Sequence, residues 1–471
     1  MKHNYRFHHT IALTITLLGC GDVRDSVRAV TGELGTPGTL NTSLIGRYDF
    51  GADQNTGDLA IAGDHAYVAR RSGGFAVVDI ADRAAPTLVT TIIPAVGATD
   101  VTDVATQNIA GTDYLFVGNY AGVPDPTYGN FTGVYIYSLA NRAAPALVRV
   151  LTYGAGAGYH FASQVRTLTT AELGGRAFLF VGSVMTGGIV AYEVTNPTAP
   201  TFFTSIIRNR VSNSATICDI VVQGSRLYAA WRVGFAVYDL SAFPSIAPNY
   251  YNPAQPPTLV AKLYTGAGTN TAVPTPSGDY VLTTDDVTNG RVRVWDVRVP
   301  SAVVQVSALS GSTGAIARHV AVRGNLAWVA NQQDGLRVFD LSNPAAPISL
   351  AWFDTDGAVP SNRRIGGWDV IPDGDTAWFT DSADGLHAVN IEDTLTAQSA
   401  TWSSGQQQLV VRVTSSLQPR PTLTVTGFGP MTWVPLSSRY ELTAPAGASP
   451  GTVTVTSSYG ATRTVSVVSG N

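Results

Sequence analysis

The sequence predicts an all-β protein: a ring of repeated four-stranded sheets, a β-propeller with seven blades, followed by a small β-sandwich. Three observations predict this architecture. A strand-turn-strand pattern returns seven times, and the glycines that open successive copies stand between 45 and 59 residues apart. Glycine and proline are abundant, at 47 and 26 residues, and no stretch after residue 30 has the periodicity of an amphipathic helix. After Thr394 the pattern stops, and two-residue alternation replaces it.

The charge of the chain excludes one class of partner. Only 13% of the 471 residues are charged, lysine occurs only at Lys2 and Lys262, and the net charge is −4. A nucleic-acid-binding surface needs a concentrated positive field. We therefore expect no nucleic acid among the partners.

Residues 1–20 have the layout of an export signal. Lys2 and Arg6 make a positive start, and the apolar run that follows is too short to span a bilayer. The signal ends in Leu17-Leu18-Gly19-Cys20, which resembles the lipobox of bacterial lipoproteins. That resemblance implies that Cys20 becomes the lipidated first residue of the mature protein. Ordinary cleavage nearby and no cleavage remain the alternatives.

Lipidation implies an exported, membrane-anchored lipoprotein in the periplasm or on the cell surface at the outer membrane, with the lipid as its only membrane contact. Residues 21–42 are rich in Gly, Thr and Ser and predict a flexible tether. The only other cysteine is Cys218. With Cys20 bearing the lipid, we expect no internal disulfide and a small, buried, apolar role for Cys218.

Each copy of the repeat predicts four strands. The third strand opens on glycine and runs to an aspartate, as in Gly335-Leu336-Arg337-Val338-Phe339-Asp340, and a proline opens the fourth. Both faces of these strands are apolar, as a sheet requires when it is packed between two neighbours of its own kind. The third strands are expected at Gly74–Ile80, Gly133–Leu139, Gly188–Val194, Gly234–Leu240, Gly290–Val297, Gly335–Leu341 and Gly385–Ile391.

The last copy lacks a fourth strand, because no proline-led apolar run follows Ile391. The missing strand is expected at the other end of the chain. Leu44-Ile45-Gly46-Arg47-Tyr48-Asp49 matches the pattern of the outer strand Ser349-Leu350-Ala351-Trp352-Phe353-Asp354. Its pairing with the last sheet would leave no open edge at the junction. We therefore expect one closed propeller over residues 43–394.

The stretch from Gly335 to Pro347 reads Gly-Leu-Arg-Val-Phe-Asp-Leu-Ser-Asn-Pro-Ala-Ala-Pro. It resembles the LVIVD repeat of bacterial and archaeal surface-exposed propeller proteins. The segment from Gly74 to Pro86 is the clearest second copy. The resemblance implies a secreted or surface-anchored propeller.

Residues 395–471 predict a separate module. Short alternating strands are expected at Leu409–Val413, Leu423–Thr426, Tyr440–Leu442 and Thr452–Thr456, with Gly, Pro and Ser turns between them. Their number and length suit a small immunoglobulin-like sandwich. The ending from Gly451 to Gly460 resembles bacterial Ig-like modules, which implies a spacing, stabilising or adhesive role.

The sequence contains no familiar catalytic motif. It lacks a phosphate loop, a His-Glu-x-x-His pair and a Gly-x-Ser-x-Gly elbow. Asp279, Asp285 and Asp286 stand close together without the spacing of an EF-hand. They predict a polar hairpin turn, with a calcium site as the alternative.

A ring of polar residues is the strongest candidate site. In a propeller, the starts of the first strands surround one mouth of the central channel. Two interpretations stay open: each aspartate ties off the backbone of its own strand, or the ring holds a metal ion or a polar ligand. His319 and Arg166 favour the second, because they break the acidic pattern. The aligned residues are Asp58, Asp103, Arg166 (or Gln164), Asp219, Val273, His319 and Asp369.

The loops expected at this mouth are long and aromatic, whereas the hairpins at the opposite end are short. Uneven, aromatic loops on one face are typical of recognition surfaces. Drift in loop length without function is the alternative. The candidate partner-binding residues are Tyr120, Asp125, Tyr128, Phe131 and His160.

Two functions follow, from different classes. The first is a non-enzymatic, lipid-anchored surface protein that binds a protein or glycan partner through its channel face and uses no cofactor. The alternative is a hydrolase, lactonase or oxidoreductase with a divalent metal between Asp103, Asp219, Asp369 and His319. Propellers host both classes, so the fold alone does not choose.

Overall fold

The structure is a computed structural model, and it describes residues 39–51, 56–94, 100–120, 131–153, 164–183, 188–206, 216–245, 257–266, 268–312, 314–355 and 365–470. These residues form β-strands joined by turns, without an α-helix. Three short 3-10 turns interrupt them: η1 (Phe243–Ser245), η2 (Pro300–Ala302) and η3 (Pro435–Ser437). No helix in the described part of the chain is long and apolar enough to cross a membrane. The prediction of an all-β protein is confirmed.

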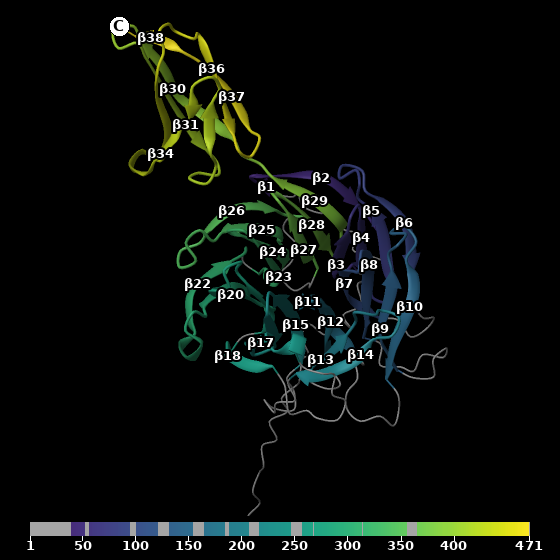
Figure 1. Cartoon of the computed structure of the whole chain (residues 1–471). Helices are drawn as coiled ribbons and strands as arrows, with labels where there is room; N and C mark the ends of the chain where they lie inside the picture. The colour runs from purple at the N-terminus through teal and green to yellow at the C-terminus, as the bar shows by residue number, and fades with distance from the viewer. Residues whose placement is uncertain are drawn as a thin grey trace, which may run out of the picture.

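Between Thr39 and Ile391 the described residues form seven antiparallel sheets around a common centre (Figure 1). Sheet 1 contains β3 (Leu59–Ala62), β4 (His65–Ala69), β5 (Phe75–Asp79) and β6 (Thr87–Ile92). Sheet 2 contains β7 (Val101–Ile109), β8 (Thr112–Asn119), β9 (Phe131–Ser138) and β10 (Ala146–Tyr153). Sheet 3 contains β11 (Val165–Leu173), β12 (Arg176–Ser183), β13 (Gly188–Glu193) and β14 (Thr201–Ile206).

The remaining four sheets continue the same order. Sheet 4 contains β15 (Ile217–Gln223), β16 (Arg226–Trp231), β17 (Gly234–Asp239) and β18 (Thr258–Tyr264). Sheet 5 contains β19 (Thr269–Pro274), β20 (Tyr280–Asp285), β21 (Arg291–Asp296) and β22 (Val304–Ser310). Sheet 6 contains β23 (Ile316–Arg323), β24 (Leu326–Gln332), β25 (Gly335–Asp340), β26 (Ile348–Phe353) and the added β1 (Thr39–Leu40). Sheet 7 contains β27 (Gly367–Asp373), β28 (Thr376–Asp381), β29 (Gly385–Ile391) and β2 (Thr42–Tyr48).

The first strands of the seven sheets contact one another in a closed cycle. β3 lies against β7, and the contacts continue through β11, β15, β19, β23 and β27 back to β3. Apolar clusters fill the space between adjacent sheets; Tyr67, Val104 and Tyr135 belong to one that joins sheets 1 and 2. β4 and β24 are buried along their whole length. Packing between two neighbours explains why both faces of these strands are apolar.

The N-terminal strands join the last two sheets. β2 pairs with β29 from Thr42↔Ile391 to Tyr48↔Leu386, where the sequence predicts the closing strand. β1 pairs with β26 on the neighbouring sheet. The expected tether, residues 21–42, is therefore too long at its C-terminal end, because its last residues are strand. Residues 21–38 lie outside the described residues.

The repeated glycine has a steric cause. Gly74, Gly335 and Gly385 open the third strands β5, β25 and β29, each with positive φ. A Cβ at any of them would lie 2.1–2.2 Å from a carbonyl oxygen at the end of the fourth strand. Only glycine allows the two strands to approach this closely.

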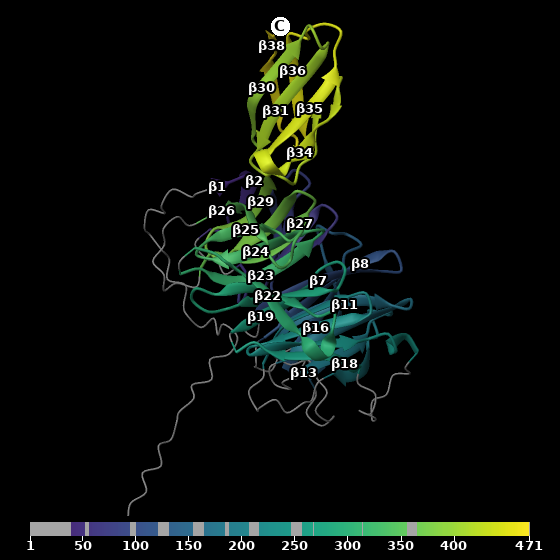
Figure 2. The same cartoon turned by 90° about the vertical axis from the view of Figure 1, so that its left-hand side faces the viewer.

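Residues 395–470 form two further sheets around their own core (Figure 2). Their shared apolar cluster includes Leu409, Val411, Leu423 and Val455. One sheet contains β34 (Thr432–Val434), β35 (Arg439–Pro445), β31 (Gln408–Ser415), β30 (Leu395–Ser403) and β38 (Val468–Gly470). The other contains β33 (Gly429–Pro430), β32 (Leu423–Val425), β36 (Thr452–Ser457) and β37 (Thr462–Ser466).

The junction between the two parts is polar and partly buried. Arg420 pairs with Asp340 of β25 at 3.0 Å. Asp393 is buried and accepts hydrogen bonds from the hydroxyls of Ser415 and Ser457. These contacts fix the start of the C-terminal sandwich against sheet 6 and the end of β29.

Candidate functional site

In six of the seven sheets, the first strand begins with a β-bulge or a similar irregularity. Where β7, β11, β15, β23 and β27 start, the register with the second strand skips one residue. In β19 two residues, Asn270 and Thr271, have no paired residue on the second strand. The hydroxyl of Thr271 hydrogen-bonds to the hydroxyl of Thr284. A bulge turns an extra side chain toward the same rim of a sheet. The skipped residues of the five strands are Thr102, Arg166, Cys218, Arg318 and Trp368.

The bulges give the mouth two sets of side chains. We name the skipped residues, together with Gly57 and Asn270, the bulge ring. We name the residues that follow them the carboxylate ring: Asp58, Asp103, Thr167, Asp219, Thr271, His319 and Asp369. Members of both rings line one cavity of about 50 Å³, namely Asp58, Thr102, Asp103, Arg166, Thr167, Cys218, Asp219, Asn270, Arg318, His319 and Trp368.

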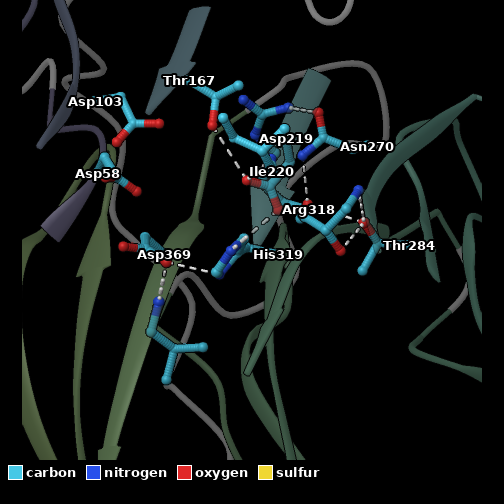
Figure 3. Close-up of polar contacts among 12 residues, drawn as sticks. Asp58, Asp103, Thr167, Asp219, Ile220, Asn270, Thr284, Arg318, His319 and Asp369 are labelled. Carbon is cyan, nitrogen blue, oxygen red and sulfur yellow. Dashed lines mark hydrogen bonds and ion pairs between the residues drawn. The ribbon is translucent and has the colours of Figure 1, made fainter. Parts of the chain in front are cut away.

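The alignment from the sequence is wrong in two places. Arg166 belongs to the bulge ring, and Thr167 takes the place expected for it. Val273 lies two residues beyond Thr271, which occupies its place in sheet 5. A bulge adds one residue to a strand and shifts every later position by one. The pattern of apolar and polar residues in the sequence does not show where that residue is added. Asp58, Asp103, Asp219, His319 and Asp369 are brought together as expected (Figure 3).

Three aspartates tie neighbouring sheets together. Each accepts a hydrogen bond from a backbone N–H in the first strand of the next sheet. The bonds run from Leu59 N to Asp369 Oδ2 at 2.9 Å, from Val104 N to Asp58 Oδ2 at 3.1 Å and from Leu168 N to Asp103 Oδ2 at 3.0 Å. Asp369 and Asp219 also accept the backbone N–H of the residue that follows them, as the backbone-tying interpretation expects. The carboxylate ring is part of what joins the sheets.

His319 forms an ion pair across the mouth. Its Nδ1 lies 2.6 Å from Oδ1 of Asp369, and its Nε2 lies 3.8 Å from Oδ2 of Asp219. Burial disfavours the imidazolium, but the two carboxylates outweigh it and raise the pKa of His319 to about 9. Burial likewise opposes the charge of Asp369, yet His319 lowers the pKa of that carboxyl to about 2. At neutral pH the ring is therefore held by an imidazolium, which has no lone pair to offer a metal.

On the side of the carboxylate ring away from His319, the carboxyls of Asp58 and Asp103 have raised pKa values. Burial, and then the nearby charges of Asp103 and Asp369, raise the pKa of Asp58 well above its usual range. Burial also raises the pKa of Asp103 to about 6, although its hydrogen bond with Asp58 works against the rise. Adjacent carboxyls in a partly dry site cannot all ionise. Of these carboxyls, Asp58 therefore holds a proton most readily, and its side chain hydrogen-bonds with Asp103 and Asp369.

The bulge ring is cationic. Arg318 is 6% exposed; its Nη1 donates to Asn270 Oδ1 at 2.8 Å and pairs with Asp286 at 3.2 Å. Its guanidinium stacks 4.2 Å from the ring centre of Trp368. Arg166 is different. Within the described part of the chain it has no carboxylate partner, and its Nε is buried without a hydrogen bond.

The acidic turn of sheet 5 contributes to the same network. Asp285 pairs with Arg293 at 2.8 Å, and Asp286 pairs with Arg318. Among the residues that the structure describes, no group of three or more His, Cys, Asp or Glu is arranged to hold a metal ion. Neither the calcium site nor the divalent metal at the mouth has a set of ligands in that part of the chain.

The loop residues can be placed only in part. Tyr120 lies at the mouth, where its backbone N–H bonds to Asp100 O at 2.8 Å. Phe131 begins β9, but its side chain is not described. Asp125, Tyr128 and His160 lie outside the described residues, as does Cys20.

Cys218 differs from expectation. It is buried in the bulge ring, as predicted, but it belongs to a disulfide, and no described cysteine is free. The prediction that this chain forms no disulfide is therefore wrong for the structure. The other cysteine of the chain lies outside the described residues.

Residues 53–92 and 314–355 match the LVIVD repeat family. The chain contains LVIVD repeats. The two LVIVD matches cover sheets 1 and 6, which contribute Asp58, Arg318 and His319 to the mouth. No curated protein matches the chain in sequence. Among solved structures, the computationally designed Ika8 protein is similar at 9% identity, over 90% of this chain and 99% of that chain, with a TM-score of 0.43.

Proposed function

We propose that the chain is an exported, lipid-anchored surface protein that binds a protein or glycan partner at the mouth of its channel. In this proposal, residues 43–394 are a closed seven-bladed propeller of the LVIVD type. Residues 395–471 are an Ig-like module. The cycle of contacts among seven first strands and the pairing of β2 with β29 support the propeller. The two-sheet sandwich with its own core supports the Ig-like module.

One observation carries the binding function: the mouth gathers side chains from all seven sheets, and its histidine and most of its carboxylates are engaged with one another or with the backbone. A general base or nucleophile needs an available lone pair within reach of a substrate. His319 is held as an imidazolium between Asp369 and Asp219. Asp58 and Asp103 accept neighbouring backbone N–H groups. A rigid, charged and irregular rim suits recognition better than turnover.

Site-specific photo-crosslinking on intact cells tests the partner-binding function. A photoreactive residue replaces Tyr120 at the mouth or Asn108 at the opposite end of sheet 2. We expect a discrete crosslinked product, protein or glycan, from position 120 alone, and its loss when Arg318→Gln is added. The same products from both positions, or none from position 120, would contradict binding at the mouth.

The lipid anchor has its own test, because the chain has two cysteines. A lipid on the sulfur of Cys20 and an intrachain disulfide of Cys218 exclude each other. Cys218 belongs to a disulfide in the structure, so the lipid anchor requires this bond to be absent from the exported protein. We then expect that protein to carry the mass of a lipid on Cys20 and a free thiol at Cys218, and Cys20→Ala to abolish the lipid. An unlipidated protein with its two cysteines joined would overturn the anchor.

A further inference from the structure

Among the described residues of the mouth, one arginine, Arg166, forms no ion pair with a carboxylate, although the charge of Asp286 acts on it. Arg71 pairs with Asp100 at 3.1 Å, and Arg318 pairs with Asp286 at 3.2 Å. Arg166 has no such partner in the described residues. Burial, and then the positive charges of Arg318 and Arg71, lower the pKa of Arg166 to about 10. The charged guanidinium of Arg166 is thus held in a buried site beside two other cations, at a cost in free energy. A residue with only a structural role would not need a charge there.

The carboxylate ring does not neutralise Arg166. Asp369 is paired with His319, and Asp58 and Asp103 contact each other and the backbone of the next sheet. Asp219 faces His319 and accepts from Thr167, the residue next to Arg166, rather than from Arg166 itself. Arg166 thus lines the cavity with a buried Nε that has no hydrogen bond, and it is available to a bound anion.

We propose that Arg166 and Arg318 bind a carboxylate group of the ligand at the channel mouth. This inference rests on the proposed function, because it names the chemistry recognised at the same mouth. A guanidinium offers parallel N–H donors that match the two oxygens of a carboxylate. The stacking of Arg318 on Trp368 and its bond to Asn270 hold one guanidinium in a fixed orientation.

The size and lining of the cavity set the ligand class. A volume of about 50 Å³ admits a head group and not a whole sugar or peptide. The acid therefore enters by its carboxylate while the rest of the molecule stays outside, over the rim. A small organic acid and a terminal sugar acid share this chemistry, and the test separates them.

Ligand titrations on the whole exported protein test the site. The probes are acetate and glucuronate, with acetamide and glucose as neutral counterparts, in low-chloride buffer at constant ionic strength. Trp368 next to Arg318 provides a fluorescence signal, assigned by its loss in Trp368→Phe, and the melting temperature provides a second readout. We expect saturable responses to the acids alone. A comparable response to acetate identifies a small-acid site, and much tighter binding of glucuronate identifies a sugar acid.

Substitutions of Arg166 distinguish recognition of the ligand's charge from binding in a neutral polar pocket. Arg166→Gln should weaken acid binding by at least about tenfold, the loss of one charge-assisted contact. Arg166→Lys should recover part of it, because the charge returns without the two-pronged donor. The control is Arg142→Gln, since Arg142 pairs with Asp113 at the opposite end of sheet 2. That control should bind as the wild type does.

Two results would overturn the carboxylate site: acids that bind no better than their neutral counterparts, or unchanged acid binding in Arg166→Gln. Failure of the inference is distinguishable from failure of the proposed function. Glucose binding that needs Trp368 and ignores Arg166 would refute the carboxylate site and keep the mouth as a binding face. Absence of both acid binding and a crosslink at position 120 would refute both.

Discussion

The two rings of the mouth differ although they come from adjacent residues of the same strands. The carboxylate ring is engaged largely from within: three of its four aspartates accept N–H groups of the next sheet, and His319 lies between Asp369 and Asp219. The bulge ring holds one well-paired arginine, Arg318, and one, Arg166, that forms no ion pair within the described residues. The repeated aspartates join neighbouring sheets. Arg166, which is not repeated, is the candidate for function.

The largest effect is expected from breaking the carboxylate ring at Asp369. Asp369→Ala should destabilise the protein by about 3–5 kcal/mol, because it leaves the His319 imidazolium and the Leu59 N–H without their partner. Asp373→Ala is the matched control, since Asp373 is in the same strand but exposed and should cost less than about 1 kcal/mol. Urea unfolding at pH 6 measures both. Equal losses of unfolding free energy in the two variants would show that Asp369 stabilises the protein no more than an exposed aspartate does.

The ion pair also sets the pH range of this effect. The pKa of Asp369 is lowered to about 2, so its contribution is present above pH 4 and is lost as the pH falls toward 2. The pKa of His319 is raised to about 9, so its contribution is present below about pH 6.5 and is lost as the pH rises through 9. The difference between wild type and Asp369→Ala should therefore shrink at both extremes.

A smaller effect of opposite sign is expected at Asp103. Burial raises its pKa to about 6, so the folded state favours the protonated carboxyl, and that stability is lost as the pH rises from about 4 through 6. Asp103→Asn keeps an oxygen for Leu168 N–H and removes the titration. The variant should be more stable than the wild type at pH 7.5 by roughly 1–3 kcal/mol, with no gain at pH 4.

The control for that prediction is Asp113→Asn in the same sheet. Hydrogen bonds from Asn108 and Arg142 lower the pKa of Asp113, so this substitution should lose stability at pH 7.5 instead of gaining it. Thermal melts across pH measure both variants. A wild type whose stability is flat between pH 4 and 7 would contradict the shared-proton description of the carboxylate ring.

The smallest effect is expected from Arg166. Arg166→Gln should leave the free energy of unfolding unchanged or raise it by up to about 1 kcal/mol, because no described partner is lost and an uncompensated cation is removed. Arg318→Gln should lower it, since Asp286 and Asn270 lose their partner. Equal destabilisation by both substitutions would place Arg166 with the structural residues and erase the difference between them.

The sequence by itself determined the repeat and its closure. The glycines at 74, 335 and 385 are readable because local strand geometry leaves no room for a Cβ. The closing strand is readable because Leu44 to Tyr48 has the pattern of an outer strand that the last sheet lacks. The aspartates of the mouth can be recognised because they recur at the start of four of the seven copies. These features depend on neighbours in the sequence or on the repeat itself.

Only the tertiary structure decided how the mouth is built. In sheet 3, Thr167 and not Arg166 occupies the position of the aspartates in the carboxylate ring. A bulge in the pairing of the first strand with the second decides this. The positions of atoms on other sheets decide that Asp103 accepts from Leu168 N and that Arg318 pairs with Asp286. They also decide that Arg166 pairs with no carboxylate in the described part of the chain. Periodicity specifies which face of a strand is buried. It does not specify which partner, from a segment dozens of residues away, will stand opposite a given charge.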